Sequence, residues 1–357
     1  MGEENRDILS HPLIEQVKAE NNFDFIRFFL AYSVMFNHFS TLTDTDPFWL
    51  VSGGFRVKGF FIISGFLVMF SYLRTPDNGI FFRKRLHRIM PAYLLTIGFC
   101  FLLGLLLTTL PWQAFLTNGQ SWKYLLSNLL TFNFISPDLP GVFEQHPMHA
   151  MNGSLWTIKV ELTLYLCVPL IYQALKRYNR ATVLGLIYLL SFSYLTLFDW
   201  LDDLHPSSFY GFMKRQFPGQ MTYFLSGVIW LVYFPYFKRW MRYIFPLSIL
   251  LFYCRDYWLC RPFEPLALAA IILTVAYSFN ALHIFNRMGN FSYGIFLAHF
   301  PIIQCLIHFG LDQYSFGLTL ALTTLLSTAI GMLSWKYIEQ PCLYKGKRKA
   351  SHSADKA

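Results

Sequence analysis

The sequence predicts an all-α integral membrane protein, a bundle of about ten transmembrane helices with both termini in the cytoplasm. Three observations predict this fold class. The 357-residue chain is 55% hydrophobic with only 14% charged residues, and its mean hydropathy is +0.39. The apolar residues form long segments, and the basic residues lie between those segments. A soluble domain of this size does not need so much apolar surface.

Several segments are long and apolar enough to cross a bilayer, which takes about 20 mostly apolar residues. The expected spans are 24–43, 56–73, 89–110, 154–175, 181–199, 217–235, 240–254, 263–281, 289–309 and 316–337. The longest connection, 111–153, contains WKYLLSNLLTFNFI, which we interpret as a re-entrant or interfacial helix.

The distribution of charge predicts the orientation. With a cytoplasmic N-terminus, 21 of the 29 Lys and Arg fall on the cytoplasmic side, as the positive-inside rule requires. The net charge of +9 is therefore an orientation signal and not a nucleic-acid signal. The chain divides into a cytoplasmic N-terminal segment at 1–22, a membrane domain at 23–341 and a basic cytoplasmic tail at 342–357.

The first expected span holds a cation near each end. In FDFIRFFLAYSVMFNH, Arg27 and His38 are eleven residues apart, so they share a helical face and lie about 16 Å apart along the axis. An ionisable group inside a membrane helix indicates function, because burying it is costly. The alternative is that Arg27 extends to the membrane surface and that a neighbour satisfies His38.

The segment FFRKRLHRIMP begins the third span on the cytoplasmic side and concentrates positive charge. Arg85 and Arg88 are one turn apart on one face, with Lys84 beside them. Because guanidinium groups match phosphate oxygens, and Arg27 lies at the same depth, we expect a cytoplasmic anion site here. The alternative is that these residues only anchor the helix by the positive-inside rule.

The segment SLWTIKVELTLYL places Glu161 about two turns into the fourth span, at a depth similar to that of His38. A histidine and a carboxylate at one site form a general base with its orienting group. The alternative is a structural ion pair of Glu161 with nearby Lys159 or with an arginine. His299 lies in the middle of another span, before Pro301, and its role stays open. The dispersed histidines predict no metal site.

Together these groups predict phosphate-binding cations at the cytoplasmic face and a base about 16 Å away toward the outer face. Acyl-coenzyme A has the matching shape, a phosphate-rich head and a long arm with a reactive tip. A cytosolic donor could extend its arm into the bundle, and an acceptor hydroxyl could arrive from outside.

The motifs also resemble those of the acyltransferase-3 family, multi-pass membrane enzymes that typically acylate extracytoplasmic glycans. The resemblance covers about residues 21–341. It is carried by FDFIRFFLAYSVMFNH, GFFIISGFLV, RKRLHRIMP, SLWTIKVELTLYL, FSYGIFLAHFP and WKYIEQP, in that order.

The resemblance implies that His38 is the catalytic residue and that Arg27, Arg85 and Arg88 serve acyl-CoA. Glu161 is similar to an acid implicated in the reaction. The chain departs from the family pattern at three positions near the outer site, which carry the basic residues Arg56, Lys58 and Lys159. We expect the stand-alone type, without a fused periplasmic esterase-like domain.

The expected function is a plasma (inner) membrane O-acyltransferase, with O-acetyltransferase favoured. Acetyl-CoA or another acyl-CoA is the expected donor. The expected acceptor is a hydroxyl of an extracytoplasmic or lipid-linked saccharide, and membrane lipids are the other partners. Direct transfer is favoured over an acyl-His38 intermediate. Alternatives are a transporter of a glycan or lipid precursor, a structural or assembly subunit, and transfer of a longer acyl group or to a small molecule.

Overall fold

The computed structural model describes residue 17 and residues 21–46, 54–287 and 289–344, and the regular structure of these residues is helical throughout. Most of the segment 1–22 and the tail beyond residue 344 lie outside the described residues. The longer helices are α2 (Phe23–Leu42), α3 (Phe55–Arg74), α4 (Asn78–Leu107), α7 (Trp156–Arg177), α8 (Arg180–Leu204), α10 (Phe217–Val232), α11 (Phe234–Tyr253), α12 (Glu264–Ser278), α13 (Ser292–His308) and α15 (Phe316–Ser334).

Each expected apolar segment coincides with one of these helices. Four of them, α3, α4, α7 and α8, are long and apolar enough to cross a membrane, as is the continuous helical stretch Phe316–Cys342 that contains α15. The α13 helix is apolar but shorter. The helical fold is thus confirmed, while the count of ten spans and the side of the termini stay predictions.

The start of α4 differs most from expectation. The helix begins at Asn78, eleven residues before the predicted start at 89. The side chain of Asp77 caps it, accepting a hydrogen bond of 2.7 Å from the backbone N–H of Ile80. The basic run of FFRKRLHRIMP is therefore helical, and this fixes the directions of Arg85 and Arg88.

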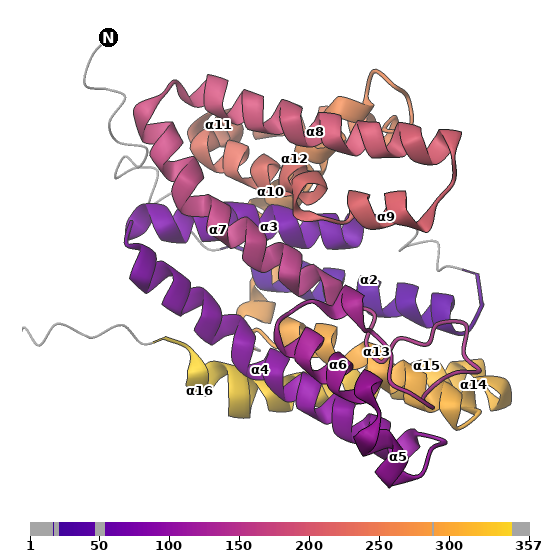
Figure 1. The fold of residues 1–357 in the computed structure, drawn as a ribbon. Coiled ribbons are helices and arrows are strands. Elements are labelled where there is room, and N and C mark those ends of the chain that lie inside the picture. Colours follow the sequence, from indigo (N-terminus) through magenta and orange to yellow (C-terminus); the bar gives the residue numbers. More distant parts are fainter. Residues whose placement is uncertain (1–16, 18–20, 47–53, 288, 345–357) are drawn as a thin grey trace, which may run out of the picture.

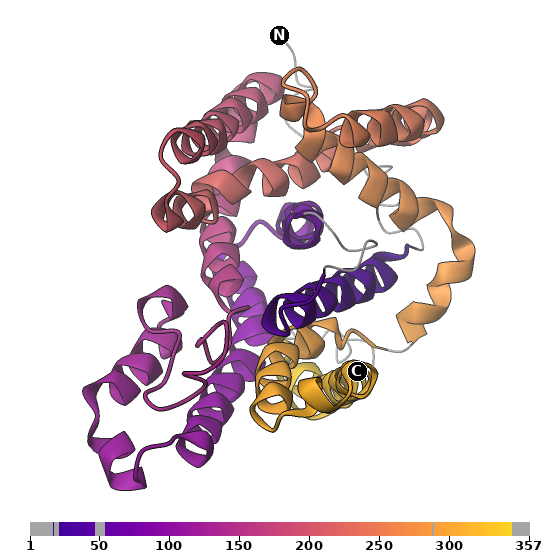
Figure 2. The same cartoon turned by 90° about the vertical axis from the view of Figure 1, so that its right-hand side faces the viewer.

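The centre of the bundle is α3, with α2 beside it and the other helices around them (Figures 1 and 2). Two glycines let α3 and α10 pack backbone to backbone. A Cβ atom at Gly65 would lie 1.9 Å from the Phe224 carbonyl oxygen, and one at Gly227 would lie 2.1 Å from the Ile62 carbonyl oxygen. This contact fixes the position of α3 and of the residues it carries into the site.

The connection between α4 and α7 contains α5 (Trp112–Thr117), α6 (Gly119–Leu129) and the 3₁₀ turn η3 (Asn133–Ile135). The α6 helix covers part of WKYLLSNLLTFNFI, and its outer face is apolar: Trp122 is 52% exposed and Leu126 is 62% exposed. An exposed apolar face on a helix of this length suits a position at the membrane interface. The interfacial interpretation therefore stays a prediction that this surface supports.

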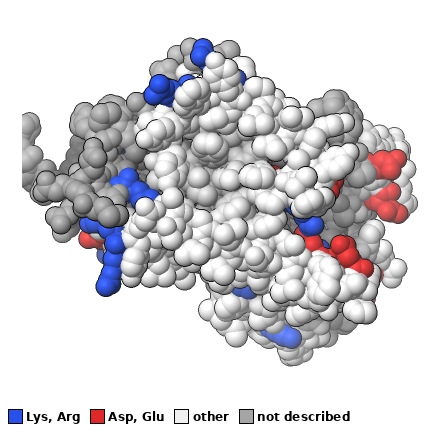
Figure 3. Space-filling model, turned by 90° about the horizontal axis from the view of Figure 1, so that it is seen from above, with Lys and Arg blue, Asp and Glu red and all other residues white. Residues whose placement is uncertain are grey.

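The remaining short elements connect the long helices. They are α9 (Ser208–Lys214), η4 (Arg261–Phe263), η5 (Asn280–Arg287), α14 (Leu311–Tyr314), the π-helical turn η6 (Trp335–Glu339) and α16 (Gln340–Cys342). In the view of Figure 3 most acidic side chains gather at one end of the molecule. A group of basic side chains lies at the other end, and the surface between is mostly uncharged.

Candidate functional site

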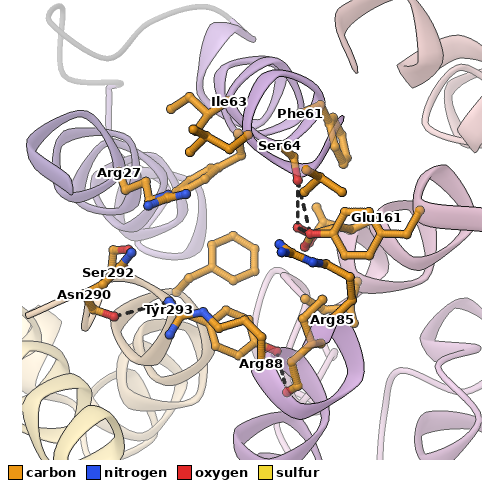
Figure 4. Close-up of a pocket in the computed structure, with 18 of the residues that line it drawn as sticks. Arg27, Phe61, Ile63, Ser64, Arg85, Arg88, Glu161, Asn290, Ser292 and Tyr293 are labelled. Atoms are coloured by element: carbon orange, nitrogen blue, oxygen red, sulfur yellow. Dashed lines mark hydrogen bonds between the residues drawn. The ribbon is translucent and has the colours of Figure 1, made fainter. Parts of the chain in front are cut away.

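A cavity of about 470 Å³ lies between α2, α3, α4, α7 and α13. Four basic side chains line it, Arg27, Lys84, Arg85 and Arg88, with one carboxylate, Glu161. The structure thus brings together all four residues predicted to bind the donor. Figure 4 shows the three arginine side chains pointing into the same space from α2 and α4. The surplus of cations in a mostly apolar wall favours an anionic ligand.

Two of the arginines are held by acidic partners. Arg27 lies 3.2 Å from Asp24, whose carboxylate also accepts a hydrogen bond from the Asn290 side chain. Arg88 lies 3.4 Å from Glu339, a carboxylate whose side chain is fully buried. These contacts fix the guanidinium positions before any ligand arrives, which lowers the entropy lost on binding.

Arg88 has two further contacts that set its direction. It donates to the backbone carbonyl of Asn290 at 3.5 Å, and its guanidinium lies over the Trp335 ring at 5.0 Å. Arg85 has fewer polar contacts than Arg88. It donates to the Ser71 hydroxyl at 3.1 Å, and its buried Nε has no hydrogen-bond partner among the described residues. A buried donor without a partner is a natural contact for a phosphate oxygen.

Glu161 belongs to this cavity and not to His38. Its Oε1 accepts a hydrogen bond of 3.1 Å from the Ser64 hydroxyl and a short one from the Tyr165 hydroxyl, and the two hydroxyls are 3.1 Å apart. In the part of the chain that the structure describes, Glu161 is not hydrogen bonded to His38. Similar depths of Glu161 and His38 were not enough to bring the two side chains together. The rotation of α7 about its axis directs Glu161 toward Ser64 on α3 instead.

His38 instead pairs with His299. Its Nδ1 lies 2.8 Å from Nε2 of His299, and the two rings are nearly parallel with centroids 5.1 Å apart. Nδ1 of His299 lies 3.1 Å from the backbone carbonyl of Ile295, which can only accept. His299 therefore carries its proton on Nδ1 and accepts through Nε2. His38 then donates from Nδ1, which leaves its Nε2 as a free base.

The two ends of the site lie on one helix. Arg27 and His38 both belong to the uninterrupted α2, so the rise per residue sets their separation at about 16 Å along the axis. His38 is half-buried and His299 fully buried, and the edge of the Phe300 ring packs against His38 at 5.2 Å between centroids.

Each of the three cations that depart from the family pattern has a polar partner, and Lys58 has an acidic one. Lys58 forms an ion pair of 3.2 Å with Glu264, and Lys159 donates to the Gln216 side chain at 2.8 Å. Arg56 donates to the Asn37 side chain at 2.8 Å, next to His38 in the chain, and its buried Nη1 has no hydrogen-bond partner among the described residues.

Three residues of the site were not predicted from the sequence. The position of His299 within a span was predicted. Its contact with His38 was not, because the two residues are 261 positions apart in the chain. Ser64 and Tyr165 received no attention, although a serine within the apolar run GFFIISGFLV was a usable signal. The described residues contain no group of three or more His, Cys, Asp or Glu that could hold a metal ion.

The chain as a whole is similar to several known proteins. The family model described as "Acyltransferase domain" matches residues 20–336. The chain is 28% identical to Nodulation protein 10 of Rhizobium leguminosarum bv. viciae, over 90% of this chain and 93% of that protein. It is 26% identical to the O-acetyl transferase of Shigella phage Sf6, over 93% of this chain and 98% of that protein.

A third similarity is to the larger O-acetyltransferase OatA of Staphylococcus aureus, at 22% identity over 84% of this chain and 54% of that protein. No solved structure matches the chain.

Proposed function

Because this chain belongs to the acyltransferase-3 family of membrane acyltransferases, we propose that it is a plasma (inner) membrane O-acetyltransferase. It takes the acetyl group from cytoplasmic acetyl-CoA and transfers it to a hydroxyl of an extracytoplasmic or lipid-linked saccharide. The names of two similar proteins, both O-acetyltransferases, support the choice of acyl group and of oxygen as its acceptor.

The cavity between α2 and α4 is the proposed donor site. Arg27, Arg85 and Arg88, with Lys84, bind the phosphates of coenzyme A, since guanidinium–phosphate hydrogen bonds are strong and often bidentate. The single observation that carries the proposal is this convergence of four cations in one mostly apolar cavity. The pantetheine arm then extends along α2 toward His38.

His38 is the proposed general base. Its free Nε2 takes the proton of the acceptor hydroxyl, and the oxygen attacks the thioester carbonyl carbon. The C–O bond forms, the C–S bond breaks, and the proton passes from His38 to the departing thiolate. Direct transfer needs no covalent enzyme intermediate; the same nitrogen could instead attack the thioester to give acyl-His38.

His299 takes the orienting role that we predicted for Glu161 from the sequence. As a hydrogen-bond acceptor it holds His38 in the tautomer with Nε2 free, and it stabilises the imidazolium that forms. Glu161, Ser64 and Tyr165 line the donor cavity as a hydrogen-bonded group. We propose that these three side chains hydrogen bond the amide groups of the pantetheine arm, which offer both donors and acceptors.

The first test is calorimetric binding of acetyl-CoA to the detergent-purified protein, beside the variants Arg88→Ala and His38→Ala. The proposal expects binding to the wild type and to His38→Ala, and weak binding to Arg88→Ala. A folded wild-type protein that does not bind acetyl-CoA would contradict the donor assignment and leave transport of a glycan or lipid precursor as the better explanation.

A further inference from the structure

Two phenylalanines of the donor cavity lie against each other, and one of them contacts His299. Phe60 on α3 and Phe296 on α13 both line the cavity, and their rings meet edge to face with centroids 6.0 Å apart. The Phe296 ring also lies 5.9 Å from the ring of His299. The aromatic pair therefore lines the cavity, and through Phe296 it also contacts His299.

The helical periodicity shows how the cavity runs toward this pair. On α13, Ser292 and Phe296 line the cavity and His299 follows on the same face, at spacings of four and three residues. On α3, Ser64 and Phe60 both line the cavity one turn apart. A ligand held by its phosphates at Arg88 and extended along these faces meets the aromatic pair as it reaches the histidines.

We propose that Phe60 and Phe296 limit the donor to short acyl groups, accepting acetyl and rejecting butyryl and longer chains. This inference rests on the proposed function, since it assumes a thioester in the cavity. The thioester carbonyl must lie beside His38 to react, so the rest of the acyl group must fit against the two rings.

The two rings are held in place by packing on the sides that do not face the cavity. Phe296 is only 7% exposed, and Phe60 packs against the cluster that contains Phe28, Phe291 and Ile295. Packed interiors tolerate added methylene groups poorly, because the surrounding side chains are forced out of their preferred rotamers. A longer acyl chain would have to displace one ring or withdraw its carbonyl from His38.

The test is the affinity of free coenzyme A, acetyl-CoA and butyryl-CoA for the purified full chain. The variants are Phe60→Ala, Phe296→Ala and the milder Phe296→Leu. The control is Phe70→Ala, a buried phenylalanine of α3 that does not line the cavity. The wild type is expected to prefer acetyl-CoA over butyryl-CoA by about tenfold or more, the scale of discrimination by pocket size.

Substitution of either ring should bring that preference close to one. Phe70→Ala should keep both the preference of the wild type and its affinity for free coenzyme A. Equal affinities of the wild type for the two thioesters would overturn the inference. An unchanged preference in folded Phe60→Ala and Phe296→Leu would overturn it too. Either result leaves the donor site intact if free coenzyme A binds. Failure of free coenzyme A to bind the folded wild type overturns the proposed function and this inference together.

Discussion

His38 and His299 face each other across α2 and α13, with Nδ1 of His38 2.8 Å from Nε2 of His299 and the rings nearly parallel at 7°. The carbonyl of Ile295 fixes the direction of both hydrogen bonds. Under the proposed function, His299 would take the place that a carboxylate has in a hydrolase triad, with no charge of its own.

Replacing His38 by Ala should abolish acyl transfer while leaving acetyl-CoA binding nearly intact. A general base contributes roughly 10²- to 10⁴-fold to the rate. The loss is measured as incorporation of labelled acetyl groups into the saccharide fraction of membranes that contain the variant. His205→Ala, an exposed histidine at the end of α8, is the matched control and should retain full activity. Normal transfer by His38→Ala would end its assignment as the base.

Replacing His299 should reveal a positioning role. A glutamine side chain at this position would keep an acceptor for the His38 N–H, and a leucine would not, so His299→Leu should lower kcat more than His299→Gln. Both variants should keep the wild-type Kd for acetyl-CoA, because His299 does not line the donor cavity. The pH dependence of transfer separates the two roles: a merely structural histidine would lower activity equally at every pH, whereas loss of tautomer control should also displace the profile.

Removing the guanidiniums of Arg85 and Arg88 should mainly weaken donor binding. A hydrogen bond to a charged group is worth about 1.5–3 kcal/mol, so the double variant Arg85→Ala with Arg88→Ala should lose at least about a hundredfold in Kd. Arg83→Ala is the control, since Arg83 belongs to the same turn region of α4 but does not line the cavity. Retained affinity in the double variant would remove the phosphate-site assignment.

Arg88→Ala alone should also lower thermal stability, because it leaves the buried Glu339 carboxylate without its cation. Breaking a buried ion pair in this way costs about 3 kcal/mol or more. Adding Glu339→Gln should restore the melting temperature without restoring acetyl-CoA affinity. If it restored both, the weak binding of Arg88→Ala would be a consequence of misfolding and not of a lost phosphate contact.

Gly65→Ala should prevent the correct packing of α3 against α10, because the added Cβ would lie 1.9 Å from the Phe224 carbonyl oxygen. The matched substitution Gly98→Ala on α4 meets no atom within 4 Å and should be neutral or stabilising by up to about 1 kcal/mol. The yield of monodisperse protein in detergent and its melting temperature measure both effects. A fully stable Gly65→Ala would show that the two helices can move apart.

The sequence predicted the helices well because an apolar run of sufficient length has few other stable states in a membrane. It misplaced the start of α4, because the basic residues between Arg83 and Arg88 resemble a loop by composition, although Asp77 caps a helix there. It predicted the four cations of the cavity from their depth and helical face.

It could not predict the partner of His38. Depth along the membrane normal follows from residue number, but which helices face each other depends on rotations that only the packed structure fixes. Similar depth favoured Glu161 as the partner of His38, and the role of His299 stayed open; the packing of α13 against α2 brings His299 to His38 instead.

Because α2 is continuous, it sets a fixed distance between Arg27 and His38. The proposed function therefore requires a thioester whose arm matches the distance between them. Thioesters of shorter thiols, which lack the phosphates, would reach His38 without an anchor. A single residue inserted between Arg27 and His38 would turn His38 by about 100° away from His299. The distance between Arg27 and His38 therefore cannot be changed without also breaking the contact of the two histidines.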